Sequence, residues 1–233
     1  RFRELVAEVL GVNPTDLTRL HTLQVKELSL DGNECEELEG SEEHSSNDCF
    51  ESPHGLPRPP VRGGRWARKW HSSHRSAARQ EFDTMFHDFV QQVIVPNMNY
   101  AHGELSPRAV DFAYQQSPTF RVQEPACRPM GYLHTDADYH HPPAEVNWWL
   151  PLTQVWGNNT LHIESAPARG DFTPVELSYG EVLRFYGNLC QHHTVANDTG
   201  VCRVSFDLRV LSLKHHDPEW TDQRGRRCTF EVG

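Results

Sequence analysis

The chain has 233 residues, 37% of them hydrophobic, with a formal net charge of -10. This length allows one sizeable core with a helical flank, and the absence of a long apolar run argues against a membrane span. A uniformly acidic protein is a poor candidate for nucleic-acid binding. None of the six cysteines forms a C-x-x-C pair, so we expect reduced cysteines in a cytoplasmic protein.

The first hundred residues predict a helical flank that is interrupted by a charged insertion. Apolar residues of Phe2–Leu10 fall on one helical face. Residues 81–95 repeat apolar side chains at i, i+3, i+4 and i+7, which predicts a core-facing helix ended by Pro96. Between them, 31–51 are acidic without Lys or Arg, and 58–79 are basic without Asp or Glu. We predict a mobile insertion at about 31–79; solvated loops are the simpler interpretation, and docking of a protein partner is the alternative.

From about residue 117 the pattern changes to short β-rich runs separated by Gly, Pro, Asn and Asp turns. Many short strands at this spacing are typical of a jelly roll. We therefore predict one catalytic domain of mainly β class with flanking helices, a double-stranded β-helix, whose helical flank spans 1–100, core 101–215 and C-terminal tail 216–233. The expected strands are 119–124, 131–136, 145–152, 160–165, 172–177, 181–186 and 201–211.

The densest chemical signal is the run from Gly131 to Asp136. Side chains alternate in a strand, so His134 and Asp136 should share one face. Two histidines and one carboxylate hold Fe(II) while leaving coordination positions open. His-x-Asp alone is a weak motif in a chain with 15 histidines. The expected third ligand is His192, which follows the strand at 181–186; His193 is the alternative.

A carboxylate-binding pair follows the distal histidine. From His192 the sequence fits H-x10-R-x-S, which ends at Arg203 and Ser205. These two residues share a strand face, and the planar guanidinium matches a carboxylate. We expect them to bind the far carboxylate of a cosubstrate whose 2-oxo acid end chelates iron. Tyr132 shares a face with His134 and is expected to touch this cosubstrate.

Two further alternating pairs are candidates for contact with a polar substrate. Arg121 and Gln123 lie on the strand before the His-x-Asp motif, and Asn147 and Trp149 lie on another strand. The alternatives are a surface position for Arg121 and ordinary packing for Trp149. Arg209 is a reserve anchor for a carboxylate, although a surface position on its strand is the preferred interpretation.

These linked motifs resemble the Fe(II)/2-oxoglutarate oxygenases, and within them the streptomycin-biosynthesis-type branch, which is distantly similar to the phytanoyl-CoA dioxygenases. The resemblance covers about 118–211. It implies a double-stranded β-helix that uses Fe(II), 2-oxoglutarate and O2, and that releases succinate and CO2. The runs that carry it are Pro118–Gln123, His134–Tyr139, Glu145–Leu152, Asn159–Leu161 and Arg184–His192.

The resemblance also implies roles for single residues. The implied iron ligands are His134, Asp136 and His192, and Arg203 with Ser205 is the implied 2-oxoglutarate anchor. Related halogenases replace the carboxylate ligand with a small residue. The presence of Asp136 therefore implies hydroxylation, desaturation or oxidative cyclisation.

Three functions stay open at this point. The first is oxidation of a C–H bond in a small polar metabolite, amino-acid- or aminocyclitol-like by analogy with the branch. The second is a cupin-type dioxygenase, isomerase or hydrolase that uses the same ligands without 2-oxoglutarate, which an Arg203 turned away from the metal would favour. The third is a binding module without catalysis, which loss of a ligand would favour.

Overall fold

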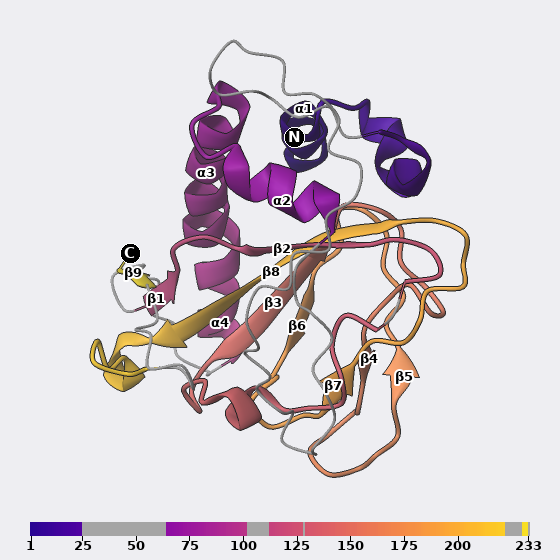
Figure 1. The fold of residues 1–233 in the computed structure, drawn as a ribbon. Helices are drawn as coiled ribbons and strands as arrows, with labels where there is room; N and C mark the ends of the chain where they lie inside the picture. The colour runs from indigo at the N-terminus through magenta and orange to yellow at the C-terminus, as the bar shows by residue number, and fades with distance from the viewer. Residues whose placement is uncertain (25–63, 102–111, 128, 222–229, 233) are drawn as a thin grey trace, which may run out of the picture.

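Two antiparallel sheets form the centre of the protein, and helices cover one of them (Figure 1). The computed structural model describes residues 1–24, 64–101, 112–127, 129–221 and 230–232. The larger sheet has the order β6 (Leu183–Phe185), β3 (Val146–Pro151), β8 (Arg203–Ser212), β1 (Phe112–Gln115) and β9 (Phe230–Val232), with β2 (Thr119–Gln123) also paired to β8. The smaller sheet has the order β5 (Thr173–Pro174), β4 (His162–Ile163) and β7 (His192–His193). This jelly roll confirms the predicted mainly β class with flanking helices.

The longest strand, β8, separates the apolar core from a polar interior by simple alternation. Its even-numbered residues Val204, Phe206, Leu208 and Val210 are fully buried in the hydrophobic core. The odd-numbered residues from 203 to 209 are polar, and three of them line a cavity between the sheets: Arg203, Asp207 and Arg209. Because successive strand residues point to opposite faces, one strand contributes to both layers.

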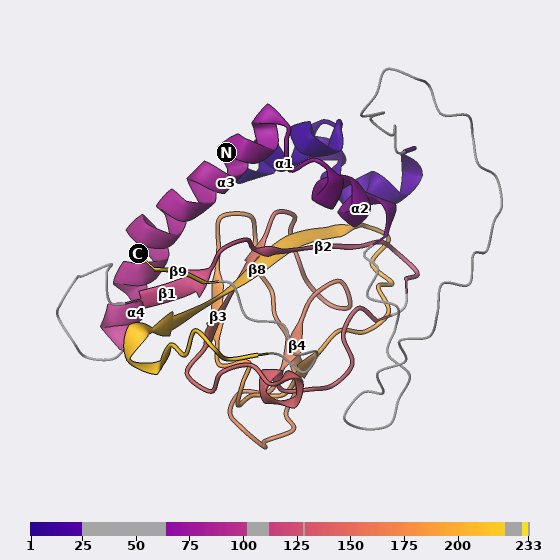
Figure 2. The same ribbon diagram turned by 60° about the vertical axis from the view of Figure 1, so that its left-hand side comes forward.

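The helices pack on the apolar face of the larger sheet, and Figure 2 shows them on the side away from β4. The ring centroid of Phe206 lies 5.3 Å from that of Phe2 and 5.7 Å from that of Phe82, so α1 and α3 both contact β8. Prediction of the first helix is confirmed residue for residue. The helical segments are α1 (Phe2–Leu10), η1 (Pro14–Thr22), α2 (Arg65–Ser72), α3 (Ala77–Phe89), η2 (Val90–Ile94) and α4 (Val95–Ala101). Two short 3-10 turns follow later in the chain: η4 (Asp136–Tyr139) after β2 and η5 (Leu213–His215) after β8.

Pro96 does not end the second helix, so that prediction is wrong. The α-helix changes to a π-helical turn at η2, where the Val95 N–H donates to the Val90 carbonyl oxygen five residues earlier. Pro96 is therefore the second residue of a new helical segment. A proline is tolerated in the first turn of a helix, where an N–H has no intrahelical acceptor.

The expected insertion at 31–79 ends earlier than predicted. Residues 25–63, which include most of it, lie outside the described residues. Residues 65–72 form α2, whose Trp66 and Trp70 are at most 1% exposed. The Trp70 ring stacks on Phe120 of β2 with a centroid distance of 4.5 Å. Basic residues thus share this segment with two tryptophans that belong to the core.

Most expected strands occur with shifted or shorter bounds, but the one at 131–136 does not form. His134 makes only an isolated bridge to His192, and Asp136 begins the 3-10 turn η4. β1, β7 and β9 were not predicted. Strands of two or three residues such as β7 and β9 carry too little sequence for a period of two to be recognised.

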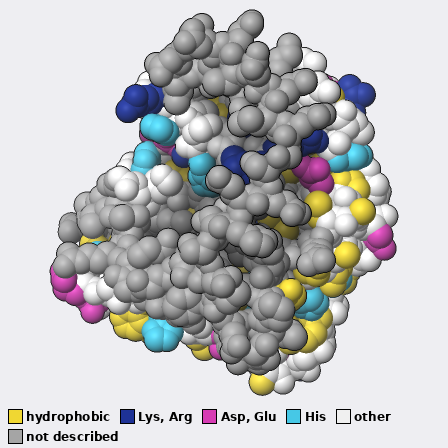
Figure 3. Space-filling model, in the orientation of Figure 1, with side chains coloured by type: hydrophobic (Ala, Val, Ile, Leu, Met, Phe, Trp, Pro, Cys, Tyr) yellow, Lys and Arg dark blue, Asp and Glu magenta, His cyan; other side chains and the backbone are white. Residues whose placement is uncertain are grey.

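On the face that Figure 3 shows, the described residues carry side chains of both charges. In the view of Figure 3, basic and acidic side chains lie scattered among white and yellow ones. Cys127, Cys190 and Cys202 are free thiols. Within the described ranges, no helix combines the length and apolar character needed to cross a bilayer.

Candidate metal centre

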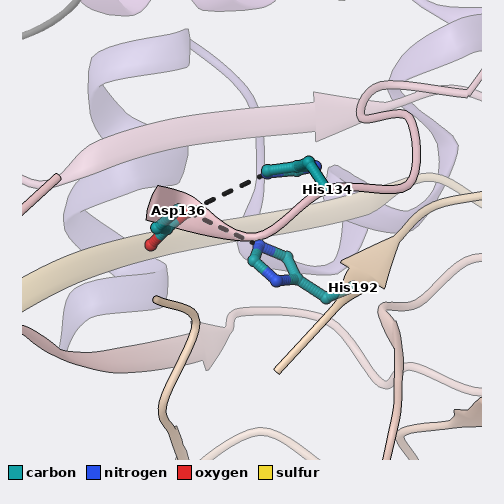
Figure 4. Close-up of side chains that lie close together, drawn as sticks. All are labelled: His134, Asp136 and His192. Carbon is teal, nitrogen blue, oxygen red and sulfur yellow. Dashed lines mark ion pairs between the residues drawn. The ribbon is translucent and has the colours of Figure 1, made fainter. Parts of the chain in front are cut away.

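His134, Asp136 and His192 converge in the interior between the two sheets (Figure 4). One potential ligand atom from each lies within 4.8 Å of the others. The Nε2 atoms of His192 and His134 lie 3.6 Å and 3.9 Å from Asp136 Oδ1. The side chains of Asp136 and His192 are at most 9% exposed and that of His134 is 15% exposed. The three groups are spaced to hold a single ion.

Backbone pairing brings the two histidines together. The His134 N–H donates to the His192 carbonyl oxygen at 3.2 Å, and the His192 N–H donates to the His134 carbonyl oxygen at 2.9 Å. This exchanged pair sets the two residues directly opposite each other, with ring centroids 4.3 Å apart. His192 also pairs with Ile163 of β4 on its other side. The bridge therefore adds His134 to the edge of the smaller sheet.

Asp136 reaches the same place through a turn rather than through strand alternation. Thr135 caps η4 in a reciprocal capping box with Asp138, which fixes the turn just after His134. The Asp136 N–H donates to the Gly187 carbonyl oxygen at 2.7 Å. The motif spacing correctly brings His134 and Asp136 together, but the expected geometry behind it is wrong.

Both imidazoles present Nε2 toward the shared centre. Nδ1 of His134 contacts the carbonyl oxygen of Tyr132, and Nδ1 of His192 lies 3.1 Å from that of Cys190. A carbonyl oxygen only accepts, so each Nδ1 carries the proton and each Nε2 of the neutral ring keeps its lone pair. Burial, with a contribution from His192, lowers the pKa of His134 to about 4. His134 is therefore neutral at pH 7, as a metal ligand must be.

One oxygen of the Asp136 carboxylate accepts hydrogen bonds from neighbouring side chains. Oδ2 accepts from Asn147 Nδ2 at 2.7 Å and from Arg209 Nε at 3.1 Å. Burial alone would raise the pKa of Asp136, but the charge of Arg209 holds that pKa well below its ordinary value. The group is thus ionised, with Oδ1 left toward the two Nε2 atoms.

His193 lies beside the centre without joining the set. Its ring stacks on His162 with a centroid distance of 5.3 Å and meets the edge of Phe172 at 5.0 Å. The group of potential ligands contains His192 and omits His193. The geometry therefore favours His192 of the two alternatives.

Arg203 is a buried cation with almost no partners. It is 0% exposed; its Nη2 donates to Met130 Sδ at 3.4 Å, and its guanidinium carbon lies 5.8 Å from the centroid of the Trp149 ring. Its Nε and Nη1 have no hydrogen-bond partner, although Arg203 lines the same cavity as His134, Asp136 and His192. Burial, and then the charge of Arg121, lowers the pKa of Arg203 to about 9. A buried donor group without an acceptor indicates a site for an anion.

The other two residues predicted to contact a cosubstrate differ in placement. Ser205 is 0% exposed and its hydroxyl has no partner. It shares the inward face of β8 with Arg203. The Tyr132 side chain is not among the residues lining the cavity, and its backbone carbonyl contacts His134 instead. Of the three residues predicted to contact a cosubstrate, Arg203 lines the cavity, and Ser205 and Tyr132 are both absent from the lining.

Three of the four predicted substrate residues line the cavity, namely Arg121, Asn147 and Trp149. Arg121 donates from Nε to Asp207 Oδ1 at 2.8 Å. Gln123 is absent from the lining; it is 1% exposed, and its Nε2 donates to the Val195 carbonyl oxygen at 2.8 Å. The Gln123 amide therefore binds the backbone of the segment that contains Val195, not the cavity.

Sequence reasoning missed several residues around the centre. Asp207 continues the alternation that singled out Arg203 and Ser205, so the same signal would have found it. The preferred surface position of Arg209 is wrong, since its side chain is 13% exposed and touches Asp136. Glu164 accepts from the N–H groups of Ala168, Gly170 and Gln191, which ties a loop to the residue before His192; no sequence signal marks it.

Comparison with known proteins supports the expected resemblance. No protein-family model matches the sequence. The chain is 41% identical over 125 residues, 53% of its length, to the streptomycin biosynthesis protein StrG of Streptomyces griseus. The expected likeness to the streptomycin-biosynthesis branch is therefore confirmed in sequence. The chain spans 59% of the length of StrG.

Solved structures overlap with part of this chain at low sequence identity. The α-ketoglutarate-dependent non-haem epimerase SnoN, from nogalamycin biosynthesis, has a TM-score of 0.42 and 18% identity, with 55% of this chain and 56% of SnoN covered. CytC3 with Fe(II) and α-ketoglutarate has a TM-score of 0.38 and 15% identity, with 57% of this chain and 59% of CytC3 covered. The match to StrG, rather than these overlaps, carries the resemblance.

Proposed function

We propose that the protein is an Fe(II)/2-oxoglutarate-dependent oxygenase. The observation that carries this proposal is the pairing of two features in one cavity. One is a buried two-histidine, one-carboxylate set with its ligand atoms free, a donor set suited to non-haem iron. The other is Arg203, a buried guanidinium with two unpartnered nitrogens.

The charges around the cavity support a doubly charged cosubstrate. The guanidinium groups of Arg121, Arg203 and Arg209 are matched in number by the carboxylates of Asp136, Glu145 and Asp207. A ferrous ion would add two positive charges to this balanced interior. The dianion of 2-oxoglutarate would offset them, which a buried centre requires.

Each residue has a definite task in this proposal. His134, Asp136 and His192 would hold Fe(II), and Arg203 with the Ser205 hydroxyl would hold the far carboxylate of 2-oxoglutarate. Tyr132, whose carbonyl oxygen contacts His134 Nδ1, is a further candidate for cosubstrate contact. Once bound, iron, 2-oxoglutarate and O2 supply oxidative decarboxylation to succinate and CO2, coupled to oxidation of a substrate C–H bond.

The substrate proposal rests on unpartnered polar atoms in the cavity wall. Asn147 Oδ1 and Trp149 Nε1 are buried without partners, so the wall offers one acceptor and one donor. The Arg121–Asp207 pair adds both charges. We propose a small polar metabolite, amino-acid- or aminocyclitol-like, which the name of StrG also suggests. The proposed reaction is hydroxylation, desaturation or oxidative cyclisation.

The competing cupin-type enzyme without 2-oxoglutarate would leave Arg203 without a task. A guanidinium turned away from the metal would favour that alternative, whereas Arg203 lines the cavity. An unpaired buried cation costs several kcal/mol. A role in binding an anion accounts for its presence.

Admission of O2 to the loaded protein tests the activity without a known substrate. Protein with Fe(II) and carbon-1-labelled 2-oxoglutarate is prepared anaerobically; after O2 enters, labelled CO2 is counted and the unlabelled succinate is quantified by mass spectrometry. We expect slow, equimolar release of both, and its loss in His134→Ala. Release that is equal in the variant, or absent from the parent, would overturn the proposed function.

A further inference from the structure

Two side chains hold the oxygen of Asp136 that faces away from the histidines. Asn147 Nδ2 lies 2.7 Å and Arg209 Nε 3.1 Å from Oδ2. Asn147 and Arg209 are register partners on β3 and β8, so both project into the interior from adjacent strands. Their donors approach one carboxylate oxygen and leave Oδ1 to the two histidines.

Arg209 is itself held firmly in place. Its Nε lies 3.5 Å from Glu145 Oε2, and its Nη1 lies 3.9 Å from Asp207 Oδ2. Glu145, 1% exposed, also lies 3.0 Å from His141 Nδ1. Three carboxylates, those of Asp136, Glu145 and Asp207, therefore surround the guanidinium.

Gly187 leaves the room that this arrangement needs. A Cβ atom at position 187 would lie 2.8 Å from Asn147 Nδ2 and 2.9 Å from Asp136 Oδ2. Contacts this short force a neighbour to move. The Gly187 carbonyl oxygen also accepts from the Asp136 N–H. Gly187 therefore positions Asp136 in two ways, through this hydrogen bond and through the space that the absence of a Cβ leaves.

We propose that Asn147 and Arg209, with the space left by Gly187, form a carboxylate clamp that restricts Asp136 to ligation through Oδ1 alone. This inference rests on the proposed function, because it assigns positioning residues to the same metal site. It also gives Asn147 a second task, since its amide N–H serves Asp136 while its carbonyl faces the cavity.

The clamp matters for the number of open coordination positions. A carboxylate that uses both oxygens occupies two of the six positions of an octahedral ion, and one that uses a single oxygen occupies one. Two histidines and a one-oxygen carboxylate leave three positions open. A 2-oxo acid that chelates through two atoms and O2 together need three.

The test uses Co(II) as a spectroscopic probe, so its readout does not depend on turnover. Asn147→Ala removes one donor, and Gly187→Ala displaces both partners without deleting a functional group. Asn158→Ala and Gly64→Ala are the matched controls, because Asn158 bonds an exposed Asp198 and a Cβ at Gly64 would meet only Glu124 at 3.8 Å. Far-UV circular dichroism of the metal-free proteins establishes that each is folded.

We expect both clamp variants to bind Co(II) about 10- to 100-fold more weakly, the usual effect of removing a partner of a metal ligand. Their visible cobalt spectra should also change in shape and intensity, because Asp136 becomes free to ligate through two oxygens. The controls should match the parent in both measurements. If Gly187→Ala does not fold, Asn147→Ala decides.

Different results separate the two proposals. A folded Asn147→Ala protein with the parent's cobalt spectrum would overturn the clamp, and so would a parent that binds no cobalt. If the parent binds cobalt, the clamp variants change its spectrum, and 2-oxoglutarate has no effect on the parent spectrum, the clamp stands and the proposed function falls.

Discussion

Replacement of Arg203 by methionine should weaken 2-oxoglutarate binding and strengthen the metal-free fold. Two of the guanidinium nitrogens have no partner in the protein. A hydrogen bond to a charged group contributes about 1.5–3 kcal/mol. Loss of roughly 2–3 kcal/mol would lower affinity for 2-oxoglutarate about 30- to 150-fold.

The stability change has the opposite sign. Arg203 is 0% exposed and burial lowers its pKa to about 9. The unfolded arginine keeps its ordinary pKa, so the folded state at pH 7 carries the cost of a buried, unpaired charge. Exchange of buried charge for an apolar side chain of similar volume often stabilises by about 1–4 kcal/mol. Metal-free Arg203→Met should therefore unfold at higher urea concentration than the parent.

The assay combines two measurements on the same samples. Anaerobic titration with 2-oxoglutarate in the presence of Fe(II) gives the affinity, and urea unfolding of the metal-free protein gives the stability. Arg68→Met, at an exposed position of α2, is the matched control and should change neither quantity. If Arg203→Met binds 2-oxoglutarate within about twofold of the parent, the assignment of Arg203 is refuted.

Three further predictions concern the ligands and the core. His192→Ala should weaken Fe(II) binding by more than the roughly 100-fold seen for partners of ligands, whereas His193→Ala should retain binding, as measured by anaerobic titration; equal losses would contradict the choice of His192. Acidification of the metal-free protein from about pH 6.5 to pH 4 should lower the free energy of unfolding by up to about 3 kcal/mol through His134. The reason is that His134 takes up a proton near its ordinary pKa in the unfolded protein, whereas its pKa in the folded protein is about 4. His134→Asn should reduce this dependence of the unfolding free energy on pH, as measured by urea titrations at several pH values. Trp70→Ala should cost about 3–5 kcal/mol, and a thermal transition unchanged from the parent would exclude α2 from the core.

Local pattern was sufficient for the elements with many residues. The nine residues of α1 and the ten of β8 each contain several repeats of their hydrophobic period, so period and position could be predicted. α2 was missed because its basic residues conceal two tryptophans one turn apart. Its burial depends on Phe120, more than forty residues away, which a local window does not include.

The metal set was predictable as residue types and spacing, and its geometry was not. His134 and Asp136 meet because a bridge to His192 is followed at once by a capped turn, and neither follows from strand alternation. Strand alternation alone led to the prediction of Asn147 as a substrate contact and of Arg209 as a surface residue. Their contact with Asp136 depends on strand register and on Gly187, which are set by tertiary packing.

Anaerobic addition of 2-oxoglutarate to the protein with Fe(II) tests the central proposal most directly. Chelation of iron by a 2-oxo acid gives a weak visible charge-transfer band, so binding is observed without substrate or O2. We predict a band that saturates at one equivalent of iron and is lost in His192→Ala. Iron binding without any band would contradict the use of 2-oxoglutarate and transfer support to a cupin-type enzyme with the same three ligands.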